Sequence, residues 1–328
     1  KVKLMNRNFF IILALVITLV ITISLTKSKD EVKIYKVAFV SLSKVDDNTF
    51  NGFKTKMESY GWKEGENIEY IVPGAAQVSE KLKPIVKSVI EKKPDLILVS
   101  STPATQEVKR AVKGLNIPVV FCPVNDPVSS NIVINQNAPE GNITGIRLPT
   151  GDSKRFEWLH TISPNIKNVL IPYSKNDESA IASRDAIREV AKSLNITLIE
   201  KAFLETMTIE QFFEQCPKCS DAIFLPRDSR IEARIKNFVK YSIDNKLPLS
   251  VPSYQQVQEG ALFTYGFIHE QLGKQSARMA DRILRGVNPE DLPVKYGNAY
   301  LVINKKTAKQ INISFSDSVI RNAKLIIE

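Results

Sequence analysis

The sequence predicts an α/β protein made of two similar lobes, each built on a doubly wound parallel sheet. Short uninterrupted apolar runs alternate with segments whose apolar residues recur at helical spacing. This alternation is typical of parallel strands that helices cover on both faces. The order of strand, polar turn and helix in the first half of the chain returns in the second half. The length of 328 residues also exceeds that of one ordinary domain.

The clearest unit of this kind spans residues 94–127. Residues 96–99 form a continuous apolar run, which predicts a buried strand. Pro103 suits the first position of a helix, and Thr102 suits its N-cap. The apolar face of that helix consists of Val108, Ala111, Val112 and Leu115. A second strand begins at residue 117, so the segment is predicted to be a βαβ unit of a parallel sheet.

The remaining elements of the first half follow from the same patterns. Strands are predicted at residues 36–40, 68–72 and 142–148. One helix carries Phe50, Phe53 and Met57 on a single face and ends near Gly61. A further helix buries Leu82, Ile85, Val86, Val89 and Ile90. The first crossing between the lobes is expected near Pro149.

The second half repeats this order of elements. An apolar run at residues 221–225 precedes a polar turn and a helix with Ile231, Ile235 and Phe238 inward. Further strands are predicted at residues 168–171, 197–199, 247–249, 261–266 and 300–303. Further helices are predicted around residues 187–194, 269–285 and 305–311. The repeat is one of architecture rather than of sequence, and it indicates two similar lobes.

Polar side chains follow the predicted strands at the edge where open parallel sheets bind their ligands. The candidate ligand-binding residues are Ser41, Ser101, Thr102, Thr105, Asp126, Tyr173, Asp228 and Tyr254. The start of the helix near Thr102 exposes unpaired N–H groups and a partial positive charge, which suit a carboxylate. Thr105 adds a hydroxyl donor. Asp228 would pair with a ligand cation, and the two tyrosines would cover the apolar part of the ligand.

Simpler roles remain open for three of these residues. Thr102 is also a suitable helix cap, and Asp126 is a suitable residue to start the turn before Pro127. Asp228 is in a position to cap the helix that follows it. The pattern alone does not separate these structural roles from contact with a ligand.

Residues 9–25 form a run of 17 residues without a charge, preceded by three basic residues. The run is just long enough to span a bilayer, and no Ala-x-Ala-like cleavage site follows it. We therefore expect an uncleaved membrane anchor, with a cleaved signal segment as the alternative. The small excess of basic residues before the run favours a cytoplasmic N-terminus, which would place the rest of the chain outside the membrane.

Charge and motifs exclude several functions. The net charge is +10, but the basic residues are scattered among acids, so nucleic acid is not an expected partner. The sequence contains no G-x-G-x-x-G, P-loop, H-E-x-x-H or G-x-S-x-G motif. This absence favours a binding protein over an enzyme, and we expect neither a cofactor nor a metal site.

The three cysteines carry no clear chemistry. Cys122 lies in an apolar strand and is expected to be buried and inert. Cys216 and Cys219 form a lone CxxC that precedes a strand, without a second pair of metal ligands. Structural thiols or a local disulfide are expected there, and redox chemistry or a metal remains an alternative.

Eight stretches of the sequence match a known family. They are GFKTKMESYGWKEGENIEY, PDLILVSSTPATQEVK, IPVVFCPVNDPVSSNIV, EGNITGI, LPRDSRIEA, VQEGALFTYGF, LGKQSARMADRILRGVNPEDLPV and LVINKKTAKQI. Over about residues 35–315 the chain resembles ABC-transporter substrate-binding proteins of the tryptophan-binding type. The resemblance implies the type I periplasmic-binding-protein fold, with two lobes joined by a three-crossing hinge. It also implies that the lobes close on an amino acid or a related small molecule and present it to a membrane permease.

The chain departs from the family pattern at three places. The turn after the first strand contains Ser41 and Ser43 where the family usually has His-Pro. Ile268 and His269 stand where the family has Asp-Tyr, so an acid that would meet a ligand amine is missing. Arg227 stands where the family has Thr. These departures leave open a ligand other than an ordinary α-amino acid.

The resemblance and the residues together predict an extracytoplasmic solute-binding protein of an ABC importer, with a small amino-acid-like or carboxylate ligand. The alternative is a membrane-anchored sensor that binds a similar ligand and signals to a separate partner. The expected partners are the small-molecule ligand, an ABC permease and the membrane. The expected division is an N-terminal segment at residues 1–30, a first lobe at 35–148 plus 267–290, and a second lobe at 149–266 plus 291–328.

Overall fold

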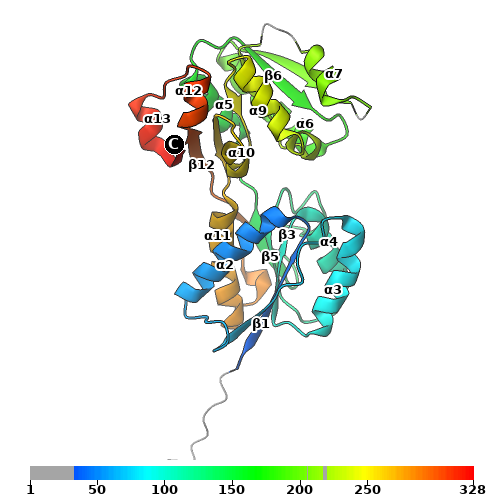
Figure 1. Cartoon of the computed structure of the whole chain (residues 1–328). Coiled ribbons are helices and arrows are strands. Elements are labelled where there is room, and N and C mark those ends of the chain that lie inside the picture. Colours follow the sequence, from blue (N-terminus) through cyan, green and yellow to red (C-terminus); the bar gives the residue numbers. More distant parts are fainter. Residues whose placement is uncertain (1–32, 205, 217–219) are drawn as a thin grey trace, which may run out of the picture.

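The computed structural model describes residues 33–204, 206–216 and 220–328, which form two α/β lobes (Figure 1). The predicted N-terminal segment at residues 9–25 lies outside the described residues. Among the helices in the described ranges, none combines the length and the apolar character that a bilayer crossing requires.

The first lobe contains a six-stranded sheet in which all neighbouring strands are parallel, in the order β11-β5-β4-β3-β1-β2. Its strands are β1 (Tyr35–Ser41), β2 (Ile68–Ile71), β3 (Leu96–Ser100), β4 (Val119–Val124), β5 (Ile143–Arg147) and β11 (Lys295–Tyr296). Its helices are α2 (Asp47–Ser59), α3 (Leu82–Glu91), α4 (Thr102–Ala111) and α11 (His269–Leu284), with short 3-10 turns η1 (Lys44–Asp46), η2 (Ser79–Lys81) and η3 (Pro289–Asp291).

The second lobe contains a seven-stranded sheet in the order β13-β12-β10-β9-β8-β6-β7. Its strands are β6 (Asn168–Tyr173), β7 (Thr197–Ala202), β8 (Ala222–Phe224), β9 (Leu249–Ser250), β10 (Phe263–Gly266), β12 (Tyr300–Asn304) and β13 (Ala323–Ile327). Its helices are α5 (Asp152–Ile162), α6 (Glu178–Ser193), α7 (Ile209–Glu214), α8 (Ser229–Glu232), α9 (Ile235–Asp244), α10 (Tyr254–Gln258), α12 (Lys305–Gln310) and α13 (Asp317–Asn322).

The predicted α/β architecture with two parallel-sheet lobes is confirmed. The second sheet differs from the prediction in one respect, because β12 runs antiparallel to β10 and β13 runs parallel to β12. The chain enters β12 from the other lobe through residues 297–299, without the crossover helix that would return it in the parallel direction.

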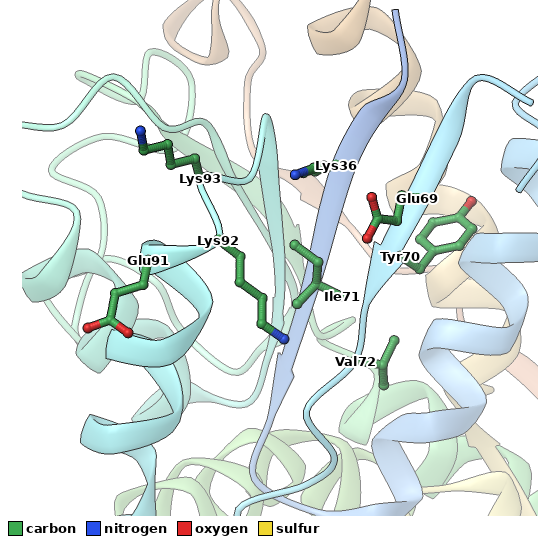
Figure 2. Close-up of a pocket in the computed structure, with 8 residues that line it drawn as sticks. All are labelled: Lys36, Glu69, Tyr70, Ile71, Val72, Glu91, Lys92 and Lys93. Atoms are coloured by element: carbon green, nitrogen blue, oxygen red, sulfur yellow. The ribbon is translucent and has the colours of Figure 1, made fainter. Parts of the chain in front are cut away.

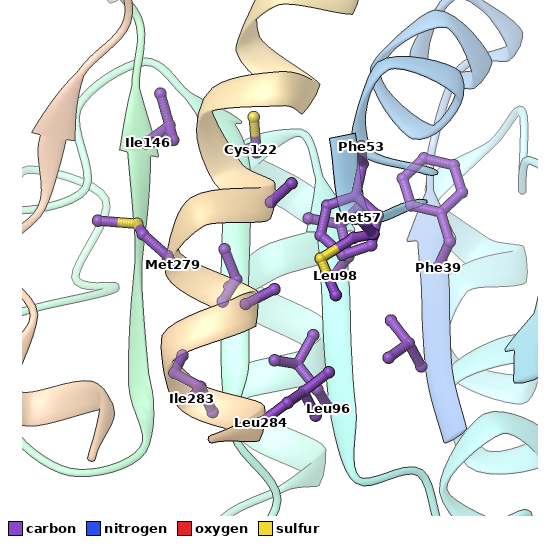
Figure 3. Packing of buried hydrophobic residues seen from close by; sticks show 14 of the residues in the cluster. Phe39, Phe53, Met57, Leu96, Leu98, Cys122, Ile146, Met279, Ile283 and Leu284 are labelled. Atoms are coloured by element: carbon purple, nitrogen blue, oxygen red, sulfur yellow. The ribbon is translucent and has the colours of Figure 1, made fainter. Parts of the chain in front are cut away.

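Burial on both faces of the sheet explains why the central strands of the first lobe are continuous apolar runs. All five residues of β3 and all six of β4 are buried. Leu96 and Leu98 of β3 pack in the core under α2 and α11, whereas Ile97 and Val99 pack in the core under α3 and α4. Figure 3 shows the first of these cores, in which Met279 and Ile283 of α11 lie over the strands. Successive side chains of a strand point to opposite faces, so both faces require apolar residues.

Three local predictions are wrong. Ser101, not Thr102, is the N-cap of α4, and Thr102 is the first residue of the helix, followed by Pro103. The single helix predicted after residue 229 is divided into α8 and α9. The C-terminal α13 and β13 were not predicted at all, because α13 is a short helix without an apolar stripe and the apolar part of β13 is limited to residues 325–327.

Three segments connect the two sheets. They are residues 148–151 between β5 and α5, residues 267–268 between β10 and α11, and residues 297–299 between β11 and β12. Gly297 in the third segment donates its N–H to the carbonyl oxygen of Arg147, which precedes the first segment, at 2.8 Å. The expected lobe boundary at residue 291 does not match this arrangement, because β11 pairs with β5 in the first sheet.

The described cysteines are Cys122 and Cys216, and both are free and buried. Burial raises the pKa of the Cys122 thiol to about 12 and that of the Cys216 thiol to about 11. Neither thiol therefore ionises readily, which disfavours thiolate chemistry at either position. Cys219, the second cysteine of the predicted CxxC pair, lies outside the described residues.

Candidate functional site

A cavity of about 880 Å³ lies between the two lobes, at the carboxyl ends of β4, β5 and β8. The first lobe lines it with Thr102, Gln106, Asn125, Asp126, Ser129, Ser130 and Arg147. The first crossing and the second lobe line it with Thr150, Gly151, Asp152, Ser153, Ser179, Ala182, Ala186 and Arg227. Its size is that of a small-molecule site, and its walls belong to two bodies that share a hinge.

The lobes touch beside this cavity. Asn125, the residue after β4, donates a hydrogen bond from Nδ2 to Oγ of Ser179 on α6, at 3.0 Å. The bond joins the polar edge of the first sheet to a helix of the second lobe. A change in the angle between the lobes would therefore alter this contact and the shape of the cavity together.

Arg147 ends β5 and is 9 % exposed. Its guanidinium lies 4.7 Å from the ring centroid of Tyr296 on the neighbouring β11. Nη1 is 3.4 Å from the Tyr296 hydroxyl, Nη2 is 3.7 Å from Oδ2 of Asp126, and the buried Nε has no hydrogen-bond partner. The Arg147 side chain is thus largely buried, and its guanidinium makes no hydrogen bond of ordinary length.

A charged triad lies on the second-lobe side of the cavity. Asp152 accepts a hydrogen bond from Arg155 at 2.9 Å on Oδ1 and one from Arg227 at 2.9 Å on Oδ2. Burial alone would raise the pKa of Asp152, but the charges of both arginines hold it below its usual value. Burial lowers the pKa of Arg155 to about 10, against the opposing charge of Asp152. Both groups of the buried pair are therefore ionised at neutral pH.

The predicted residues at the start of α4 have different environments. Thr102 lines the cavity. The Thr105 hydroxyl is buried and donates to the carbonyl oxygen of Ser101 at 2.7 Å, so it is engaged inside the first lobe. Ser101 has a φ of +82°, in a backbone region that residues other than glycine rarely adopt. Its buried Oγ has no hydrogen-bond partner. The helix start that was expected to meet a carboxylate therefore borders the cavity through Thr102.

Ser41 and Asp126 lie at other strand ends of the first lobe. Asp126 lines the cavity, and its Oδ1 accepts hydrogen bonds from the N–H groups of Val128 and Ser129. Partial burial would raise the pKa of Asp126, but these two bonds and the charge of Arg147 lower it below the usual value. Ser41 is buried at the end of β1, beside Ser100 of β3, and is not among the lining residues.

Asp228 is buried and held within its own lobe. It accepts hydrogen bonds from the N–H and the hydroxyl of Ser174, at 2.7 and 3.1 Å. It also accepts hydrogen bonds from the N–H groups of Arg230 and Ile231, at 3.0 and 3.1 Å. Asp228 therefore begins the short α8 and ties it to the end of β6, which is the structural role left open by the sequence.

The two predicted tyrosines lie away from the described lining of the cavity. Tyr173 ends β6, where the guanidinium of Arg184 lies 4.7 Å from its ring centroid. Tyr254 begins α10, and its N–H donates to the carbonyl oxygen of Phe267 in the second crossing. Of the eight predicted residues, Thr102 and Asp126 line the cavity.

Asp46 of the first lobe and Glu232 of α8 in the second lobe are carboxyl groups with raised pKa values. Asp46 is buried in the first lobe, where burial raises its pKa against hydrogen bonds from Ser100 and Ser43. The surrounding protein likewise raises the pKa of Glu232, and the charges of Asp46 and Asp228 raise it further. These acidic residues belong to both lobes, as the arginines that line the cavity do.

A second hollow of about 520 Å³, shown in Figure 2, is lined by residues of the first lobe alone. Its charged lining residues are Lys36, Glu69, Glu91, Lys92 and Lys93. A change in lobe angle would not alter this hollow, so it is a poorer candidate than the interlobe cavity. Within the described ranges, no group of three or more His, Cys, Asp or Glu side chains could hold a metal ion.

The prediction missed Arg147, Arg227, Gln106, Asp152 and Ser179 as lining residues. Arg227 had a usable signal, since it lies two residues after the repeated strand and stands where the resembled family has Thr. Arg147 had a weaker signal as the next-to-last residue of the strand predicted at residues 142–148. Ser179 and Asp152 lie near helix starts in the second lobe, and their approach to the cavity depends on how the lobes are arranged.

Comparison with known proteins agrees with this architecture. The chain is 26% identical to a tyrosine-binding protein of Clostridioides difficile (strain R20291) over 268 residues, which cover 81% of this chain and 77% of that protein. The crystal structure of an ABC domain in complex with L-Trp from Streptococcus pneumoniae aligns with a TM-score of 0.76 at 24% identity, covering 90% of this chain and 100% of that one. A ligand-free, open substrate-binding protein with adhesive properties from Clostridium difficile aligns with a TM-score of 0.75 at 24% identity, covering 90% and 99%.

These likenesses confirm the type I periplasmic-binding-protein fold and the resemblance to proteins of the tryptophan-binding type. The family model described as ABC transporter substrate binding protein matches residues 33–327, which is nearly all of the described chain. The chain therefore belongs to the family of ABC transporter substrate binding proteins.

Proposed function

We propose that the protein is the extracytoplasmic solute-binding component of an ABC importer, which holds a small amino-acid-like or carboxylate ligand between its lobes. The observation that carries this proposal is the cavity of about 880 Å³ that both lobes line with polar and charged side chains at strand ends. The likeness to a tyrosine-binding protein supports an amino-acid-like ligand. The first lobe would comprise residues 33–148 and 267–297, and the second residues 149–266 and 298–328.

The predicted site residues take two kinds of role in this proposal. Ser101, Thr102 and Asp126 would meet the ligand, since they lie at the cavity or next to a residue that lines it. Tyr173 and Tyr254 would approach it from the second lobe as the lobes close. Ser41, Thr105 and Asp228 would hold the strand ends and helix starts in place through their buried positions.

The partners of the proposed function are a membrane permease, which receives the ligand from the closed form, and the membrane itself. Residues 9–25 would anchor the chain, with the two lobes on the outer side of the membrane. Such an anchor would keep the binding protein close to its permease and raise the local concentration of loaded protein.

A thermal-shift screen of the full-length chain tests the function. The panel contains the L-amino acids, small dicarboxylates and nucleosides. A ligand present at about 100 times its Kd adds about 2.7 kcal/mol of stability and raises the melting temperature by several degrees. We expect at least one amino-acid-like or carboxylate compound to give such a shift.

Ala182→Trp and Ala138→Trp form a matched pair of variants for this screen. Ala182 lines the cavity and Ala138 is exposed on a loop away from it. The tryptophan at 182 should fill the cavity and abolish the shift, whereas the one at 138 should leave it unchanged. A screen without any stabilising compound, or a shift that survives in Ala182→Trp, would contradict the proposed function.

A further inference from the structure

The wall of the interlobe cavity is hydrophilic. Its described lining consists of polar, charged and small side chains, and none of these residues is aromatic or a larger aliphatic residue than alanine. Sites that take large apolar groups are lined mainly by apolar and aromatic side chains. This cavity therefore suits a ligand that carries polar or charged groups over most of its surface.

Arg147 contributes unused hydrogen-bonding capacity from the first lobe. A guanidinium has five N–H donors, and the side chain of Arg147 is 10 % exposed. Its nearest polar contacts are 3.4 Å from the Tyr296 hydroxyl and 3.7 Å from Asp126, and its buried Nε has no partner. A buried charge without close hydrogen bonds is unfavourable unless another group completes its environment.

Arg227 contributes the same chemistry from the second lobe. One edge of its guanidinium is held by Asp152 at 2.9 Å, while Nη1 is 3.4 Å from the carbonyl oxygen of Pro149 in the first crossing. Its buried Nε has no partner. Pro149 lies two residues after Arg147, so the two arginines meet the cavity beside the same crossing segment.

The two acids that line the cavity cancel only part of this positive charge. Both oxygens of Asp152 are bound by Arg155 and Arg227, and one oxygen of Asp126 is bound by two backbone N–H groups. Three guanidiniums against two carboxylates leave this side of the cleft with one positive charge. A single carboxylate from a ligand would neutralise it.

We propose that Arg147 and Arg227 jointly bind a carboxylate of a small, hydrophilic, acidic ligand, of which an acidic amino acid is the representative. The inference rests on the proposed function and narrows its ligand class. Arginine pairs with carboxylates through two parallel N–H···O bonds, which fixes orientation as well as charge. Because each lobe supplies one arginine, the pair determines specificity in the closed form.

Calorimetry on the full-length chain tests the inference with L-glutamate, L-aspartate and succinate against L-tryptophan, L-tyrosine and L-leucine. We expect an acidic compound to bind most tightly. Arg147→Gln and Arg227→Gln should each weaken that binding by at least about 30-fold, because each leaves a buried ligand charge with one partner fewer. Arg188→Gln removes an equal charge from an exposed ion pair on α6, and it should change the affinity by less than about threefold.

The outcomes separate the inference from the function on which it rests. Tight binding of an aromatic or aliphatic amino acid together with no binding of the acids would overturn the inference and leave the proposed function standing. The inference would also be overturned if an acid bound the wild type and both Arg147→Gln and Arg227→Gln kept their affinity for it within threefold of the wild-type value. If none of the compounds in this set or in the wider screen binds, both proposals fail.

Discussion

Replacement of Asp152 by asparagine is expected to destabilise the protein by about 3–5 kcal/mol. The carboxylate lies between two guanidiniums at 2.9 Å, and Arg155 is 1 % exposed. Arg155 also donates to the carbonyl oxygen of Leu225 and contacts the Phe224 ring, so it has no route to water. Asparagine keeps the shape but leaves a buried positive charge without its counter-ion. Urea unfolding followed by circular dichroism at pH 7 measures the loss.

The pH dependence of this loss gives a sharper test. The pKa of Asp152 is lowered in the folded protein, so its ionised form stabilises the fold above the ordinary carboxyl pKa, and this stabilisation is lost as the pH falls through the folded value. The difference between the wild type and Asp152→Asn should therefore be largest at neutral pH and shrink below about pH 4. Asp185→Asn, at an exposed ion pair on α6, serves as the control and should cost less than about 0.5 kcal/mol. A loss below about 1 kcal/mol at pH 7 for Asp152→Asn would refute the account of the triad.

Replacement of Gly273 by alanine is expected to cost about 3 kcal/mol, at the upper end of the usual range for overpacking. A Cβ atom at Gly273 of α11 would lie 1.9 Å from the carbonyl oxygen of Thr49 on α2. A Cβ atom at Gly52 of α2 would in turn lie 2.0 Å from the carbonyl oxygen of Glu270 on α11. The obstacle in each case is backbone, so the helices must separate, and α11 directly follows the second crossing.

Thermal and urea unfolding measure this effect, with Arg278→Ala as the control. Arg278 is exposed on the same helix, and its replacement should change the stability by less than about 0.5 kcal/mol. If the free energy of unfolding of Gly273→Ala is within about 1 kcal/mol of the wild-type value, then the close approach of α2 and α11 does not require glycine at this position.

The strands of both lobes could be predicted because each buried strand is an apolar run of its own. Thr102 and Asp126 could be predicted as lining residues for a similar reason, since the carboxyl end of a strand is visible in the chain itself. The sequence pattern does not predict the contact of a side chain with a residue that is distant in the sequence. Arg147 is buried by Tyr296, and Asp228 is held by Ser174, and neither partner is close in sequence.

The same limit explains the boundary between the lobes. The pairing of β11 with β5 places Tyr296 opposite Arg147, which is 149 positions earlier in the sequence. In addition, β11 is only two residues long. Its two residues are exposed and carry no apolar run. The sequence pattern therefore predicts the third crossing too early, whereas the resemblance to known binding proteins implies the correct number of crossings.

We propose that the lobes close on an acidic ligand held in the interlobe cavity. X-ray scattering from residues 33–328, with and without the acid that binds most tightly in the calorimetric series, measures this closure. At a ligand concentration about ten times the wild-type Kd, we expect a smaller radius of gyration for the wild type and for Arg188→Gln, and a much smaller decrease for Arg227→Gln, whose weaker binding leaves most of the protein without ligand. An unchanged radius for the wild type at saturation would contradict the claim.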